Sequence, residues 1–155
     1  MQLTEEQIEK MRAIGLRLDR SGTFHHGGST VTHPRLRQAL LRWLDVRPTD
    51  GKDIIRLDDK RYAYVEIEDA HLRALSAHWD GDRCRILWDD DHEEELDYAH
   101  LRQAPDNALY TTARAGKLRG RIASPAYQTV AERIVEAGTG FALEAAGQRW
   151  PITST

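Results

Sequence analysis

The chain has 155 residues, of which 40% are hydrophobic and 30% are charged, and its formal net charge at pH 7 is -3. This length is about that of one domain, and the composition is that of a globular protein with a polar surface, which excludes a disordered chain. The net charge provides no overall attraction to nucleic acid or to an anionic membrane, so either partner would need a local basic patch.

The first helix is predicted by Thr4 and Gln7, whose spacing is that of a capping box. It runs to about Ile14, and its periodicity places Ile8, Met11 and Ile14 on the packed face. We therefore treat residues 1–15 as an N-terminal helix that precedes one α+β domain over residues 16–155.

The next segments carry strand and helix signals in alternation. Residues 16–19 and 23–25 predict two short strands around a turn at Ser21 and Gly22, and extended chain resumes at residues 29–31. A second helix begins at Thr32 as its cap, with Pro34 in its first turn. Its apolar positions follow at helical spacing: Leu36, Ala39, Leu40, Trp43 and Leu44.

A β-rich block follows the second helix. Three hairpins are predicted by turn signals between alternating segments: residues 54–57 with 62–67, 72–79 with 83–88, and 108–113 with 118–123. In the strand over residues 62–67, Tyr62, Tyr64 and Glu66 share one face and Ala63, Val65 and Ile67 share the core face.

The third helix is predicted to begin at Ser124 and Pro125, which suit the cap and the first helical position. Tyr127, Val130, Ala131 and Ile134 form its apolar stripe, and Gly138 ends it. A last hairpin pairs residues 141–145 with 149–152. Hairpins outnumber crossover helices, so we predict an α+β fold, a single compact domain of antiparallel, hairpin-built sheets with about three helices.

Several segments are similar to a known family. They include residues 18–27, His33 to Leu36, Val65 to Ala70, Asp106 to Tyr110 and the C-terminal part from Ser124 to Ile152. This pattern resembles a bacterial family of unknown function, which is similar in turn to small uncharacterised eukaryotic proteins of mitochondrial type. The shared motifs are turns, caps and strand ends, so the resemblance implies a fold and carries no catalytic residue.

Cys84 is the only cysteine, so no intrachain disulfide can form. Its neighbours Arg83 and Arg85 indicate a strand, which favours a small buried thiol in a reducing compartment over a nucleophile. No apolar run approaches the ~18 residues that a membrane span needs, and the N-terminus has no signal-peptide core. We therefore predict a cytoplasmic protein without a membrane partner.

The acidic run from Asp89 to Glu95 is the first place where chemistry could reside. Clustered carboxylates can bind hard cations, but a calcium loop requires Gly at its sixth position and Glu at its twelfth. Glu94 and His100 stand at those positions when the loop is counted from Asp89. A solvated hairpin tip is therefore favoured, and we expect no metal and no cofactor.

Histidines form the second candidate site. His25, His26 and His33 lie close together in sequence, but adjacent strand residues point to opposite faces, and no zinc-ligand spacing is present. A turn histidine that bonds the backbone is the plainer interpretation. If a catalytic site exists, we expect His26 or His33 to work with Asp19.

A basic strand is the third candidate. Lys117, Arg119 and Arg121 alternate with small and apolar residues, so period two places the three cations on one face, and Arg114 lies across the turn. This group could bind a phosphate or an RNA backbone. A solvated sheet face that discourages edge aggregation is the alternative.

No catalytic signature is present, so whether the chain is an enzyme stays open. The leading hypothesis is a small binding or protein-interaction module, with an unidentified protein partner or a homodimer. The alternatives are a small metal- or histidine-dependent hydrolase and a phosphate or nucleic-acid binder that uses the basic strand, although the net charge disfavours nucleic acid.

Overall fold

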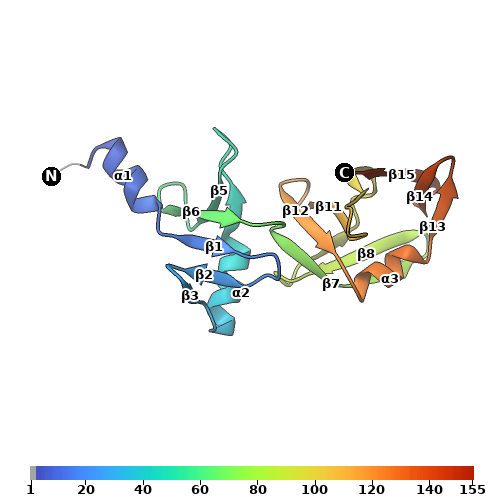
Figure 1. The fold of residues 1–155 in the computed structure, drawn as a ribbon, viewed down its shortest axis with the longest axis horizontal. Coiled ribbons are helices and arrows are strands. Elements are labelled where there is room, and N and C mark those ends of the chain that lie inside the picture. The colour runs from blue at the N-terminus through green and yellow to red at the C-terminus, as the bar shows by residue number, and fades with distance from the viewer. Residues whose placement is uncertain (1–2) are drawn as a thin grey trace. The chain divides into compact units, whose positions relative to one another are not determined.

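The computed structural model describes residues 3–155 and forms two compact units, of which the first ends at His71 and the second begins at Leu72. Three α-helices and two mixed sheets confirm the predicted α+β class. Figure 1 shows the first unit in blue to green and the second in green to red. Within residues 3–155, no helix is long and apolar enough to cross a membrane.

The first unit contains one sheet and two helices (Figure 1). Its elements are α1 Glu5–Arg12, β1 Leu16–Leu18, β2 Phe24–His26, β3 Ser29–Thr30, α2 Pro34–Trp43, β4 Leu44–Val46, β5 Asp53–Arg56 and β6 Tyr62–Ile67. The strands lie in the order β3-β2-β1-β6-β5-β4. All neighbours are antiparallel except β1 and β6, which are parallel with Leu16 opposite Val65.

The core of the first unit lies where α2 packs on the sheet. Leu18, Phe24 and Ile54 have no exposed surface, and Leu41 of α2 is equally buried. The predicted core face of β6 is confirmed at Val65, which is 6% exposed.

The capping box of α1 is confirmed, but the predicted packing face is wrong at Met11 and at Ile14, which lies beyond the end of the helix, while Ile8 is half-buried. The Gln7 amide N–H donates to Thr4 Oγ1 (3.1 Å), and the Thr4 N–H donates to Gln7 Oε1 (2.9 Å). Met11 is 65% exposed and Ile14 is 42% exposed. The helix contacts β6 through charged side chains instead, so helical periodicity misled because polar contacts replace the apolar seam.

Helix α2 begins one residue later than predicted. His33, not Thr32, is the cap: its Nδ1 accepts from the Leu36 N–H at 3.3 Å. Pro34 takes the first helical position, as expected. Leu36 is 45% exposed and Trp43 is 38% exposed, so the buried side of the helix is centred on Leu41.

The second unit is a nine-stranded sheet with one α-helix (Figure 1). Its elements are β7 Leu72–Asp80, β8 Arg83–Trp88, β9 Glu93–Glu95, the 3-10 turn η1 Tyr98–His100, β10 Arg102–Gln103, β11 Leu109–Ala113, β12 Leu118–Ile122, α3 Ala126–Ala131, β13 Ile134–Ala137, β14 Gly140–Ala145 and β15 Gln148–Ser154. The strand order is β13-β14-β15-β10-β11-β12-β7-β8-β9.

The hairpins predicted for this unit are confirmed, and two parallel contacts join them. The strand pairs β7–β8, β11–β12 and β14–β15 are antiparallel, as the turn signals indicated. The pairs β12–β7 and β10–β15 are parallel. Cys84 has no exposed surface, and burial raises the pKa of its thiol to about 11, so the prediction of a buried thiol holds.

The predicted third helix is too long and wrongly capped. Helix α3 ends at Ala131, and Ile134 begins β13, which pairs with β14. No side chain caps the helix, so Ser124 does not have the predicted role. The apolar stripe continues across the helix end because strand residues 134 and 135 pair within the sheet, which sequence periodicity could not distinguish from another helical turn.

The solvated tip predicted for the acidic run is wrong for its first residues. Asp89 is 5% exposed and Asp90 is 4% exposed. Asp90 Oδ2 accepts from Arg114 Nε (3.0 Å) and Nη2 (2.7 Å), and Asp90 Oδ1 lies 2.7 Å from His92 Nδ1. Burial of a carboxylate here is offset by a guanidinium that is distant in sequence.

Candidate functional site

A cleft of about 480 Å³ lies in the first unit, beside the end of α1 and the adjoining strands. Its charged lining comes from Arg17 of β1, Lys52 and Asp53 at the start of β5, and Glu66 of β6. Its remaining surface comes from Ala13, Ile14, Gly15, Leu16, Tyr64 and Val65. The cleft therefore combines separate charges with an apolar wall, which is typical of small-molecule sites.

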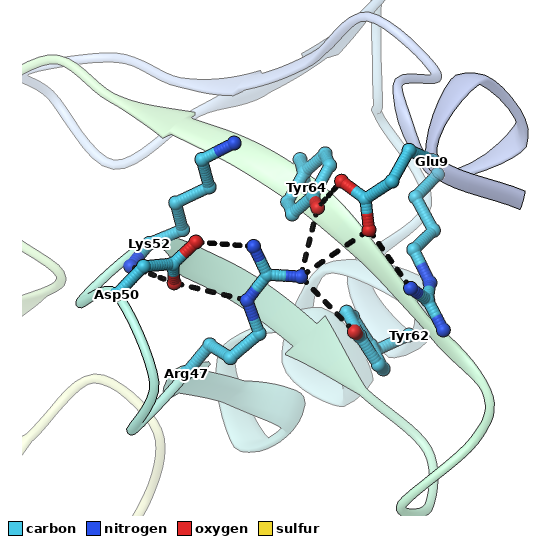
Figure 2. A network of polar contacts seen from close by, with 7 residues as sticks. Glu9, Arg47, Asp50, Lys52, Tyr62 and Tyr64 are labelled. Atoms are coloured by element: carbon cyan, nitrogen blue, oxygen red, sulfur yellow. Dashed lines mark hydrogen bonds and ion pairs between the residues drawn. The ribbon is translucent and has the colours of Figure 1, made fainter. Parts of the chain in front are cut away.

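A network of polar contacts surrounds Arg47 (Figure 2) and includes Tyr64, which lines the cleft. Arg47 follows β4, and its Nε donates to Asp50 Oδ1 at 2.9 Å. Its Nη1 donates to the hydroxyl oxygens of Tyr62 (3.1 Å) and Tyr64 (2.8 Å). Two backbone hydrogen bonds of 2.8 Å close the loop from Arg47 to Lys52: the Arg47 N–H donates to the Lys52 carbonyl, and the Gly51 N–H donates to the Arg47 carbonyl. The Lys52 N–H also donates to Asp50 Oδ1 at 3.1 Å.

Glu9 connects α1 to the same network (Figure 2). Its carboxylate accepts from the Tyr64 hydroxyl, from Arg12 Nη1 at 3.0 Å and from Arg47 Nη1 at 3.4 Å. The Arg12 guanidinium lies 3.8 Å from the centre of the Tyr62 ring. These contacts hold the end of α1, and hence the apolar wall of the cleft, against β6.

The electrostatics of the network keep its acids and bases in their ordinary charge states. The hydrogen bond from Tyr64 lowers the pKa of Glu9, and the one from Arg47 lowers the pKa of Asp50 to about 2. Burial, followed by the bond to Glu9, raises the pKa of Tyr64 above its usual value. At neutral pH, Glu9 and Asp50 are therefore ionised, and Tyr64 keeps its phenolic proton.

Lys52 differs from the other cations of this cleft. Its ammonium lies 4.8 Å from the centre of the Tyr64 ring. Across residues 3–155, no carboxylate lies within 4.0 Å of its Nζ. Arg17, in contrast, is paired with Glu68 at 3.0 Å. Lys52 therefore presents a positive charge to the cleft over an aromatic face.

Of the two carboxylates that line the cleft, one has a partner within the protein and the other has no cation nearby among residues 3–155. Asp53 Oδ1 lies 2.7 Å from Nε2 of His71, a histidine that is 1% exposed. Glu66 is exposed, and in the described part of the chain no cation lies within 4.0 Å of its carboxylate. The cleft thus offers one cation and one anion that lack ion-pair partners.

The predicted histidine site is assembled differently from expectation. Asp19 Oδ2 lies 2.7 Å from Nε2 of His25, and its other oxygen accepts from the backbone N–H groups of Ser21 and Thr23. Burial opposes ionisation of Asp19, but these bonds outweigh it and hold its pKa well below the usual range. His33 is occupied as the α2 cap, and His26 is exposed beside the turn. Asp19 therefore stabilises a turn and contacts His25, and a catalytic role for His26 or His33 with Asp19 stays a prediction.

The predicted basic group is not assembled as one cluster of available cations. Arg114 is bound to Asp90, and Arg121 donates to the Tyr110 hydroxyl and to Asp106 Oδ2 (3.2 Å). Arg119 is exposed on β12, next to Gly120 in sequence, and Lys117 is exposed before it. Anion binding by these residues stays a prediction.

Sequence reasoning missed Lys52 and Arg47 as site residues. The alternation in β6 did indicate that Tyr64 and Glu66 share a face, and both residues line the cleft. Lys52 lies in a loop after a Pro-Thr-Asp-Gly turn, where its side chain has no periodicity to follow. Only the pairing of β5 with β6 brings it over Tyr64.

Comparisons with known proteins show the fold and no activity. No family model and no curated protein match the chain. A DUF1285 family protein from Silicibacter pomeroyi DSS-3 has a similar structure, with a TM-score of 0.74 and 16% identity over 91% of this chain and 80% of that chain. A DUF1285 family protein from Shewanella baltica OS155 has a TM-score of 0.62 and 13% identity over 78% of this chain and 93% of that chain. These neighbours support the resemblance to an uncharacterised bacterial family.

Proposed function

We propose that the chain is a binding module and that the cleft lined by Lys52, Tyr64 and Glu66 holds a small ligand. The observation that carries this proposal is the Lys52 ammonium, which lies at the cleft 4.8 Å from the centre of the Tyr64 ring and has no carboxylate within 4.0 Å among residues 3–155. A cation left in this state is available for a charge-assisted hydrogen bond to a ligand.

The surroundings of Lys52 favour recognition of a charged group. The Arg47 network holds Tyr64 in place, so the ring beneath the ammonium needs no rearrangement when a ligand binds. Preorganisation of this kind lowers the entropic cost of binding. The wall formed by Ala13 and Ile14 would contact an apolar part of the ligand.

A fragment screen by ¹H–¹⁵N NMR tests the proposal. We expect fragments with an anionic group to shift the amide signals of Gly15, Lys52 and Tyr64. Lys52→Gln should weaken their binding about tenfold, which is a typical value for loss of one charge-assisted hydrogen bond.

The matched control is Lys60→Gln, because Lys60 is exposed in the turn between β5 and β6 and makes no ion pair within the described residues. This variant should bind as the original chain does. Fragments whose shifts all lie outside the cleft, or equal affinity of the Lys52 variant, would contradict the proposal.

Three broader predictions accompany this proposal. We propose a cytoplasmic location, on the grounds of the single reduced and buried Cys84. We also propose that residues 1–15 act as an N-terminal helix added to one α+β domain, and that the family extends to the eukaryotic proteins of mitochondrial type that the sequence resembles.

A further inference from the structure

We infer that the ligand of the cleft is a zwitterion with an apolar part, of the chemical class of a free aliphatic amino acid. This inference rests on the proposed function of the cleft and names its ligand. It begins from the two lining residues, Lys52 and Glu66, that have no ion-pair partner within 4.0 Å in the described chain.

The other charges at the cleft are already satisfied. Arg17 is paired with Glu68 at 3.0 Å, and Asp53 lies 2.7 Å from the buried His71. Asp50, beside Lys52 in the loop, is bound to Arg47. A ligand therefore meets one available positive charge and one available negative charge, and a zwitterion complements both.

The placement of the two charges suits a small molecule. Glu66 follows Tyr64 by two residues on β6, so their side chains share a face about 7 Å apart along the strand. The Lys52 ammonium lies 4.8 Å from the centre of the Tyr64 ring. Ile54 lies opposite Tyr64 in the β5–β6 pair, and the same register places Lys52 opposite Glu66. A carboxylate at Lys52 and an ammonium at Glu66 would thus lie on one face of the sheet beside the Tyr64 ring, with the side chain toward Ala13 and Ile14.

A purely anionic ligand fits these observations less well. A phosphate at Lys52 would share the cleft with the carboxylates of Asp53 and Glu66, and Glu66 would gain no partner. Like charges within a few ångströms oppose binding, and the opposition grows with the charge of the ligand. The ammonium of a zwitterion removes this penalty at Glu66.

The test is a titration with leucine and its two capped forms, followed by NMR shifts of the cleft amides. Leucine carries both charges, leucinamide only the ammonium and N-acetylleucine only the carboxylate, and inorganic phosphate serves as a fourth probe. We expect leucine to bind about tenfold more tightly than either capped form, because each cap removes one charge-assisted contact.

Two variants assign the contacts. Lys52→Gln should weaken leucine about tenfold and leave leucinamide unchanged, whereas Glu66→Gln should weaken leucine equally and leave N-acetylleucine unchanged. Both residues are at the surface, so both variants should keep the fold. Lys60→Gln and Glu132→Gln, which change exposed charges elsewhere, should change neither affinity.

The outcomes separate this inference from the function on which it depends. If N-acetylleucine or phosphate binds as tightly as leucine, the inference of a zwitterionic ligand is wrong and the cleft is a site for anions. Fragments that shift the cleft while leucine does not would also overturn the inference and leave the binding function. Cleft amides that respond to no fragment and to no amino acid would overturn both.

Discussion

Single residues at buried positions show most clearly how the fold depends on exact side-chain size and charge. Gly120 of β12 lies beneath the Trp88 ring, and a Cβ at this position would be 2.2 Å from ring atom Cη2. Trp88 is 1% exposed and cannot move aside without disturbing the core. Gly120 is therefore required by close packing, and not by turn geometry.

Gly120→Ala is expected to destabilise the protein by about 2 kcal/mol, because one added methyl overpacks this core. Gly140→Ala is the control, since a Cβ there meets no atom within 4 Å. Urea unfolding followed by Trp fluorescence measures both. Equal stability of the two variants would show that the Trp88 ring tolerates the methyl.

Asp90 illustrates the cost of a buried charge at the same scale. Burial raises its pKa, but the hydrogen bonds from Arg114 and His92 outweigh burial and bring the pKa below the usual Asp value. Asp90→Asn leaves Arg114 without its carboxylate and should cost roughly 3 kcal/mol at neutral pH.

The sign of the pH dependence at Asp90 follows from the lowered pKa. Its stabilising contribution is complete above the unfolded Asp pKa of about 3.9 and is lost as the pH falls through the lower folded pKa. As the pH falls from about 6 to strongly acidic values, the free energy of unfolding of the original chain should therefore decrease more than that of the Asp90→Asn variant. Parallel urea-stability curves for the two proteins would refute the assignment.

At the scale of elements, two helices with similar start signals end up with different caps. Thr4 caps α1 through a capping box, whereas Ser124 makes no cap bond to α3. The difference arises because α3 begins at Ala126, so Pro125 occupies the cap position and Ser124 lies one residue before it. A start signal therefore predicts a cap only where the tertiary path leaves the cap residue in position.

Thr4→Ala should lower the local stability of α1 by about 1 kcal/mol, the usual cost of removing an N-cap. Amide hydrogen exchange within residues 5–12 should become about fivefold faster. Ser124→Ala is the matched control and should leave exchange in α3 unchanged. Faster exchange in α3 would indicate an unrecognised role for Ser124.

At the scale of the whole molecule, both sheets are antiparallel groups joined by parallel contacts. The strand pairs β1–β6, β10–β15 and β12–β7 each connect segments that are far apart in the chain. Such long-range pairings depend on the completed core, so buried groups in these sheets should become accessible only on unfolding.

Cys84 reports this cooperativity. It is fully buried in β8, and burial raises its pKa to about 11, so little thiolate is present at neutral pH. A thiol reagent should label the native protein very slowly, with a rate that rises with urea as the fraction unfolded rises. Fast labelling without urea would mean that the second unit opens locally around β8.

Local sequence determined the hairpins, the start of α1 and the buried face of β6. Turn residues and period-two alternation act over a few residues, so no distant contact was needed to predict them. The same local signals failed at α3, where the apolar stripe runs from a helix into a strand, and at α1, where charged contacts replace an apolar face.

Only the tertiary structure decided the parallel contacts, the burial of Asp90 and the cleft. Asp90 and Arg114 are 24 residues apart, and Glu9 and Tyr64 are 55 residues apart, so no spacing rule connects them. Lys52 and Glu66 were ordinary charged residues in the sequence. They become a candidate site because the strand order places them in one cleft, while neighbouring charges find partners and theirs do not.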